Sequence, residues 1–197
     1  MEPSSRDANY AARLRRLEGA WWKRLLDVQR PYRAHLRRLD LGFMLDVGCG
    51  IGRNLVNAGG RGVGVDPNAE AIHACRERGL EALTTDEFAA STHARPERFD
   101  SLLFSHVLEH MPAAEALALV TTYLPYLRPG GRAVMITPQE AGYRSDPTHV
   151  EFVDLEKLDQ LGARAGLSRV AAYSFPFPRL VGRWFKYNEF VYIARKD

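Results

Sequence analysis

Two short polar segments of this 197-residue chain carry the residue types that proton transfer and metal binding require. The first holds His106, Glu109 and His110, spaced i, i+3 and i+4, which would face one point if the segment formed a helical turn. Imidazole and carboxylate groups placed together can move a proton or hold a divalent metal ion. The spacing therefore predicts a reactive cluster, and it leaves the metal-free and metal-bound versions open.

The second polar segment is residues 143–152, Tyr-Arg-Ser-Asp-Pro-Thr-His-Val-Glu-Phe. A neutral imidazole can take a proton from a hydroxyl group, so His149 is the leading catalytic candidate and His106 is the second. A structural hydrogen bond is the alternative for His149, and Asp146 and Thr148 could simply form a turn or cap a helix. We predict that both segments lie on one rim of an α/β sheet, where the strands end.

A glycine-rich turn offers a place for a ligand. Residues 45–54 read Leu-Asp-Val-Gly-Cys-Gly-Ile-Gly-Arg-Asn, and a second apolar run, residues 62–66, ends in Asp66. Bare backbone N–H groups and a helix N-terminus suit a polar ligand, and an acid after the next strand is placed for ribose hydroxyls. A tight turn that binds nothing is the alternative. The third glycine follows the second by two residues instead of three, which argues against a dehydrogenase.

Residues 99–104 predict a further strand, and residues 128–136 predict a turn and another strand. In this combination and order the chain resembles the class I S-adenosylmethionine-dependent methyltransferases, best over residues 42–140. The resemblance implies S-adenosylmethionine as the cofactor, with its methionine end at the glycine turn and its ribose on the acid. The residues expected to contact it are Asp46, Gly48, Cys49, Gly50, Asn54, Asp66, Pro67, Asp86, Glu87, Phe88 and Ser105.

The adenine end of that expected site involves residues 84–88, Thr-Thr-Asp-Glu-Phe. Asp86 lies where the family commonly contacts the adenine, and Phe88 is a candidate for packing beside the ring. The alternative for Asp86 is the N-cap of a helix, and both interpretations stay open.

The same resemblance bears on metal use. Ubiquinone-pathway O-methyltransferases and small-RNA 2′-O-methyltransferases carry Glu-x-x-Glu-His where this chain has His106, Glu109 and His110. In the RNA group a histidine closely followed by a phenylalanine completes the metal site, which corresponds here to His149 and Phe152. The implied site for Mg²⁺ or Mn²⁺ is therefore Glu109, His110 and His149. Many class I methyltransferases with a similar string use no metal, so direct proton removal by His149 remains open.

The acceptor is expected to be oxygen. Relatives that methylate amide or base nitrogens typically carry an Asn/Asp-Pro-Pro-aromatic motif where this chain has residues 105–111, Ser-His-Val-Leu-Glu-His-Met, and neither cysteine follows a proline, as in cytosine C5 methylation. Trp21-Trp22, Asp-Pro-Thr-His at 146–149 and Phe-Pro-Phe-Pro at 175–178 resemble actinobacterial saccharide O-methyltransferases of the mannoside type. This points to a sugar or oligosaccharide. RNA 2′-hydroxyls, small phenols or quinone precursors, and a sensor that binds S-adenosylmethionine without transferring methyl are the alternatives.

These residues need a scaffold of alternating strands and helices. We predict a Rossmann-like α/β fold over residues 41–197, with a seven-stranded, mostly parallel sheet, an antiparallel C-terminal strand and helices on both faces. A helix is expected from Asp154 to Ala165, followed by strands near 168–174 and 189–194. Residues 1–40 predict a basic helical cap, in which apolar residues recur at helical spacing: Leu14, Leu17, Trp21, Leu25 and Val28.

Composition limits the remaining choices. The chain is 46% hydrophobic with a net charge of +3, and it has neither a charged-then-apolar leader nor an apolar run of about eighteen residues. We therefore expect a cytoplasmic protein with no membrane partner, and we do not expect nucleic-acid binding. Cys49 and Cys75 are predicted to be free thiols. The aromatic residues of the last hairpin make a homodimer reasonable.

Overall fold

The computed structural model describes residues 30–197. The expected helix through Leu14, Leu17, Trp21, Leu25 and Val28 lies outside the described residues, so the division into a 1–40 cap and a 41–197 unit stays a prediction. Helix α3 (Arg30–Arg38) is the described part of that cap.

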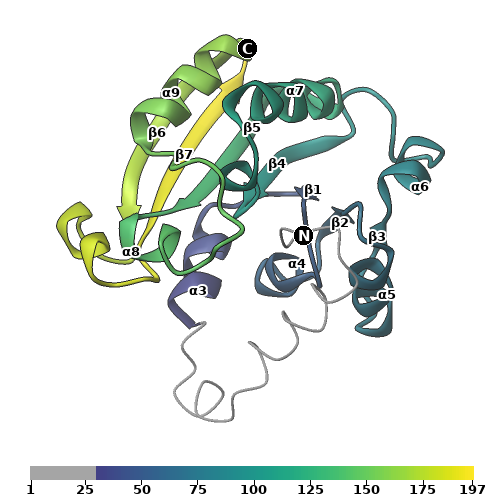
Figure 1. Ribbon diagram of the computed structural model, residues 1–197. Coiled ribbons are helices and arrows are strands. Elements are labelled where there is room, and N and C mark those ends of the chain that lie inside the picture. The colour runs from purple at the N-terminus through teal and green to yellow at the C-terminus, as the bar shows by residue number, and fades with distance from the viewer. Residues whose placement is uncertain (1–29) are drawn as a thin grey trace.

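A seven-stranded sheet crosses the molecule in the order β3-β2-β1-β4-β5-β7-β6 (Figure 1). The first five strands, β1 to β5, pair in parallel, whereas β7 runs antiparallel to both β5 and β6. The predicted fold class is therefore confirmed. The strands are β1 (Met44–Val47), β2 (Gly62–Val65), β3 (Ala82–Leu83), β4 (Phe99–Ser105), β5 (Leu127–Pro138), β6 (Leu167–Phe175) and β7 (Glu189–Lys196).

Helices cover both faces of this sheet, as the alternation of buried strand residues requires. Phe104 and Met135 pack with residues of α7 (Ala113–Tyr123) and α9 (Leu155–Arg164), whereas their neighbours Leu103 and Val134 pack on the other face with residues of α3 and α4 (Arg53–Asn57). The remaining helices are α5 (Ala69–Glu77), α6 (Thr85–Ala89) and α8 (Glu140–Tyr143), with the 3₁₀ turns η1 (Leu108–His110), η2 (Leu124–Tyr126) and η3 (Arg179–Arg183).

The C-terminal elements follow local sequence signals. Helix α9 begins where the Asp154 side chain accepts a hydrogen bond from the Lys157 N–H at 3.0 Å, and it is followed by Gly166 at φ +74°. The expected helix and the two strands after it are confirmed. The turn and strand expected over residues 128–136 fall within β5, where residues 128–131 lie as a bulge between the pairs Phe99–Leu127 and Ser101–Arg132, with Gly130 at φ +72°.

The direction of the strands determines which loops can meet. Strands β1, β2, β4 and β5 end on one rim of the sheet, and β6 ends there too, because β5 and β6 are both antiparallel to β7. Loops that follow these strands therefore gather on a single rim, which is where open α/β sheets place their ligands. In the described residues, no helix combines the length and the apolar composition needed to span a membrane.

Candidate active site

The glycine turn after β1 is a left-handed segment that only glycine adopts without strain. Gly48, Gly50 and Gly52 have φ values of 73°, 52° and 79°. A Cβ on Gly48 would also lie 2.3 Å from a methyl carbon of Val107. These glycines are therefore required by the turn itself, which bends the chain from β1 into α4.

Asp66, the acid that follows β2, holds this turn in place. One of its carboxylate oxygens accepts the Gly50 N–H at 2.9 Å, and the other accepts the Asn68 N–H at 2.8 Å. Each oxygen keeps a second lone pair for a ligand hydroxyl. The predicted ribose acid is thus also the brace of the turn.

Asp46, on β1 before the turn, is a fully buried carboxyl group, and neither of its oxygens makes a hydrogen bond of normal geometry among the described residues, although the Asn54 side chain lies within interaction range. Burial raises its pKa to about 7, although nearby Asn54 and Arg53 offset part of the rise. A buried carboxyl group with unused acceptors fits a cationic donor from a ligand. The amino group at the methionine end of S-adenosylmethionine is such a donor.

This geometry gives a prediction about protons. Between pH 4 and 7, Asp46 is more protonated in the ligand-free folded protein than in the unfolded chain. Its contribution to stability therefore falls as the pH rises through that window. A bound ammonium group favours the carboxylate, so we expect S-adenosylmethionine binding below pH 7 to release a proton and to strengthen about ten-fold per pH unit up to pH 7. Titration calorimetry in buffers of different ionisation enthalpy measures this release.

Asp46→Asn is the control for that release, because the amide cannot lose a proton in this pH range. The release should disappear in this variant, and its binding should become weaker and nearly independent of pH between 5.5 and 7. Heats that are the same in all buffers for the natural sequence would contradict the assignment.

The adenine end differs from its prediction. Thr84, not Asp86, is the N-cap of α6, and it shares a capping box with Glu87, whose carboxylate also pairs with Arg76 at 2.6 Å. Asp86 remains exposed. The expectation that the Phe88 ring packs beside an adenine is wrong, because this side chain is 2% exposed and packs against three core aromatic rings, those of Phe99, Tyr123 and Tyr126.

The remaining expected cofactor residues lie around this turn. Cys49 is buried under it, Asn54 is half-buried in α4, Pro67 is exposed after β2, and Ser105 is the buried last residue of β4. Their contacts with a cofactor stay predictions.

Both cysteines are buried free thiols, as predicted. They lie beneath the glycine turn, and both sulfur atoms approach the Gly50 carbonyl oxygen, at 3.6 Å from Cys49 and 3.2 Å from Cys75. Their neighbours are apolar residues of α5 and β3. The two thiols therefore pack against the glycine turn on its buried side.

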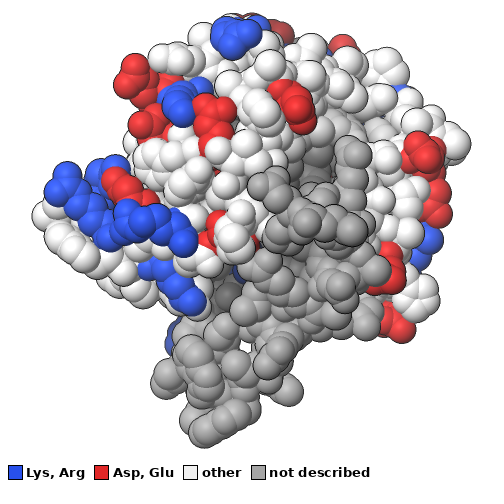
Figure 2. Space-filling model, viewed as in Figure 1, with Lys and Arg blue, Asp and Glu red and all other residues white. Residues whose placement is uncertain are grey.

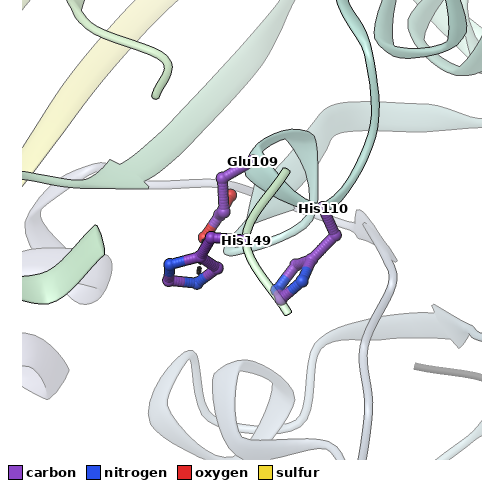
Figure 3. Close-up of side chains that lie close together, drawn as sticks. All are labelled: Glu109, His110 and His149. Atoms are coloured by element: carbon purple, nitrogen blue, oxygen red, sulfur yellow. Dashed lines mark ion pairs between the residues drawn. The ribbon is translucent and has the colours of Figure 1, made fainter. Parts of the chain in front are cut away.

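The two polar segments meet on the rim, as predicted. Glu109 and His110 come from η1, and His149 comes from the loop after α8, and each offers a ligand atom within 4.8 Å of the others (Figure 3). The Glu109 carbonyl oxygen accepts the N–H groups of Val150 and Glu151 at 2.8 and 3.1 Å, which ties the loop to η1. Backbone hydrogen bonds therefore hold the His149 segment next to Glu109 and His110.

Backbone carbonyls fix which nitrogen of each imidazole carries the proton. His149 Nδ1 lies 2.7 Å from the Tyr143 carbonyl oxygen, and His110 Nδ1 lies 3.1 Å from that of Thr148. A carbonyl only accepts, so each Nδ1 is the protonated donor and each Nε2 keeps its lone pair. Burial also lowers the pKa of His110, which keeps that ring neutral at pH 7.

Glu109 completes the cluster with a carboxylate that has an oxygen available for a ligand. Its side chain is fully buried, Oε1 lies 3.9 Å from His149 Nε2, and Oε2 has no hydrogen-bond partner among the described residues. Two imidazole nitrogens and a buried carboxylate oxygen form a donor set that suits a divalent metal ion, with the second nitrogen of each ring held by a carbonyl. The residues expected to hold Mg²⁺ or Mn²⁺ therefore fit a transition ion such as Mn²⁺ better than Mg²⁺, which prefers oxygen ligands. Asp146, by contrast, forms a turn with Thr148.

His106 contacts Glu109 but is not one of the three residues whose ligand atoms converge, contrary to the helical-turn prediction. His106 has φ +58° and lies before η1, so it is not part of the helical turn that would have placed its ring beside His110. Nδ1 lies 3.2 Å from Glu109 Oε1, and Nε2 lies 2.8 Å from Glu189 Oε1. Burial alone would lower the pKa of His106, but the two carboxylates outweigh it and raise the pKa to about 10. At neutral pH this ring is an imidazolium that bridges two acids and cannot serve as the base.

Glu189 is the residue of this site that the sequence reasoning missed. It opens β7, is 8% exposed, and lies beside a buried amide network in which Gln139 Nε2 donates to the Glu189 carbonyl oxygen at 2.9 Å. Asn188 Nδ2 in turn donates to Gln139 Oε1 at 3.1 Å. The signal available was an Asn-Glu pair directly before an apolar strand.

Comparisons with known proteins agree with this geometry. A family model described as a methyltransferase domain matches residues 21–172. The chain is 29% identical over 136 residues to tRNA (carboxymethyluridine(34)-5-O)-methyltransferase of Xenopus tropicalis, covering 68% of this chain and 21% of that protein. It is 28% identical over 102 residues to ubiquinone biosynthesis O-methyltransferase of Serratia proteamaculans, covering 48% and 42%. The matches thus span less than half of either relative.

The fold is shared with solved structures of low sequence identity. Magnesium protoporphyrin IX methyltransferase from Synechocystis PCC 6803, solved with bound SAH, superposes with a TM-score of 0.67 at 15% identity. The alignment covers 98% of this chain and 97% of that one. The described residues therefore follow one known architecture.

Proposed function

This chain belongs to the methyltransferase domain family, and from that membership we propose that it transfers the methyl group of S-adenosylmethionine to a hydroxyl group, in the first place that of a sugar or oligosaccharide. The observation that carries the proposal is the cluster of Glu109, His110 and His149, which presents unprotonated imidazole nitrogens on the rim that also holds the glycine turn. A hydroxyl acceptor needs help to lose its proton, whereas nitrogen acceptors usually do not.

The reaction requires a straight line of three atoms. The acceptor oxygen attacks the methyl carbon, a carbon–oxygen bond forms, and the carbon–sulfur bond of the sulfonium breaks with its electron pair going to sulfur. The hydroxyl proton passes to His149 Nε2, since Nδ1 already donates to the Tyr143 carbonyl. The resulting imidazolium lies 3.9 Å from the Glu109 carboxylate and returns its proton to water.

A divalent ion would be held by Glu109, His110 and His149, and when bound it would lower the pKa of the acceptor hydroxyl. In that case the three residues would act as metal ligands, and His149 would not accept the hydroxyl proton. His106, which bridges Glu109 and Glu189, would keep the Glu109 carboxylate in place. Both versions use one cluster, and they differ in sensitivity to chelators.

Oxygen as the acceptor atom is supported by the names of both curated relatives, which are O-methyltransferases acting in tRNA modification and in ubiquinone biosynthesis. The sugar acceptor rests on the resemblance of short motifs to saccharide O-methyltransferases. A cytoplasmic location and a homodimer belong to the same proposal, and two reduced thiols accord with the former.

Mass spectrometry of methyl transfer from isotopically labelled S-adenosylmethionine tests the proposal. The acceptors are oligosaccharides, short RNAs and small phenols, each with and without EDTA. We expect a labelled saccharide that disappears with His149→Ala and persists with His73→Ala, a matched change at an exposed histidine of α5. Labelled RNA or phenol would overturn the sugar assignment. Full activity after stringent EDTA treatment would overturn the metal version, and tight cofactor binding without any labelled acceptor would favour the sensor.

A further inference from the structure

The loop between β6 and β7, residues 176–188, exposes an unusual amount of apolar surface. Five of the eight large hydrophobic side chains that are exposed in the described chain lie within it, and Trp184 is the most exposed, at 74%. The other four are Phe177, Leu180, Phe185 and Tyr187. We call these five residues the apolar patch. Concentrated exposed apolar surface of this kind marks an interaction site.

Hydrogen bonds and ring contacts within the loop hold the patch outside the core. Asn188 Oδ1 accepts the Phe177 N–H at 2.9 Å, and Asn188 Nδ2 donates to the Phe177 carbonyl at 3.1 Å, which closes the loop at its base. The rings of Phe177, Phe185 and Tyr187 follow one another edge to face at 5.5 and 5.6 Å. They therefore support each other instead of folding into the core.

The same loop is basic. Arg179, Arg183 and Lys186 alternate with the apolar residues, and residues 176–188 contain no acid. Arg179 pairs with Glu140 of α8, whereas no ion pair is found for Arg183 or Lys186 within the described part of the chain. Figure 2 shows a group of basic side chains over η3 and α8, at the left of the view, with little acidic surface among them.

We propose that this loop docks the protein on the surface of an anionic lipid bilayer. Aromatic side chains and leucine at the tip would enter the headgroup zone, and the cations beside them would meet lipid phosphates. A second copy of the chain would cover the apolar side chains, but its own loop has no acid to meet the three cations, so we place the proposed homodimer interface on another surface. Single-stranded RNA would use the rings and cations but would leave Leu180 without a role.

Docking there would turn the candidate active site toward the membrane. The loop follows β6 and leads into Glu189, so it lies on the rim that carries the glycine turn and the Glu109 cluster. The sequence expectation of no membrane partner rested on the lack of a spanning segment, and surface docking needs none. This inference is independent of which acceptor the enzyme uses.

Vesicle co-sedimentation of the full chain tests it. We expect binding to vesicles with half phosphatidylglycerol, weaker binding to pure phosphatidylcholine, and a loss of binding at high salt. Trp184→Ser should reduce the partition coefficient about ten-fold, and Arg183→Gln with Lys186→Gln should reduce it about twenty-five-fold, at about five-fold per cation. Val170→Ser, and Arg164→Gln with Arg169→Gln, are matched changes at exposed positions outside the loop and should leave it unchanged.

Three results would overturn the proposal. The first is equal binding of the loop variants and the natural sequence to anionic vesicles. The second is no vesicle binding together with a dimer, seen by light scattering, that Trp184→Ser splits. The third is single-stranded RNA bound through these residues while vesicles are not. Unchanged melting temperatures in the variants would show that folding is not the cause of any loss.

Discussion

Replacement of Glu109 by glutamine is expected to lower the rate of methyl transfer about a thousand-fold while the affinity for S-adenosylmethionine changes by less than about three-fold. The substitution keeps the volume of a side chain with no exposed surface and removes its charge. The change removes the carboxylate that faces His149 Nε2 at 3.9 Å, which is also the carboxylate ligand of the cluster. Single-turnover kinetics and calorimetry measure the two quantities.

Glu151→Gln is the matched control for this variant. Glu151 lies two residues after His149, but its carboxylate contacts the Ala113 N–H at 2.8 Å and Lys157 at 2.7 Å, away from the cluster. It should retain near-normal turnover. A Glu109→Gln protein that turns over as fast as the natural sequence would remove the cluster from the mechanism, in both its metal-free and its metal-bound form.

Replacement of Asp66 by alanine should raise the dissociation constant for S-adenosylmethionine about a hundred-fold or more. The change removes the acceptor for the Gly50 N–H and for the Asn68 N–H, and with them the acid expected to bind the ribose hydroxyls. Hydrogen bonds to a charged group contribute about 1.5–3 kcal/mol each, so the loss of two or more interactions supports this magnitude. Calorimetry or fluorescence titration gives the constant.

Asp100→Ala separates the loss of a binding group from the loss of a backbone hydrogen bond. Asp100 accepts the Phe43 N–H at 2.7 Å and pairs with Arg128, but it lies near the start of β4, at the opposite end of the strand from the rim. This variant should unfold at a lower temperature and bind the cofactor normally. Equal loss of affinity in both variants would mean that Asp66 acts only through stability.

The sequence predicted those features that depend on neighbouring residues. The glycine turn was predictable because glycine is the residue that adopts the positive φ angles of positions 48, 50 and 52 without strain. The start of α9 was predictable because the side chain of an aspartate at the N-cap accepts a hydrogen bond from the backbone N–H three residues later. The meeting of the Glu109 and His149 segments followed from topology, since loops after parallel strands share a rim.

The features that the sequence did not predict depend on distant contacts. Glu189 is 83 positions from His106, and nothing local indicates that they pair or that His106 takes a left-handed backbone conformation. Phe88 is drawn into the core by rings from β4, α7 and η2. Strand β3 has two residues, which is too short for any periodicity to appear.

The thiols under the glycine turn give the chain an internal reporter. Cys49 is 6% exposed and Cys75 is fully covered, and both sulfur atoms point to the carbonyl of the residue whose N–H Asp66 holds. A reagent from solvent reaches either sulfur only when the packing around that turn opens. Alkylation of these two atoms therefore records how often the cofactor turn opens, without an engineered reporter residue.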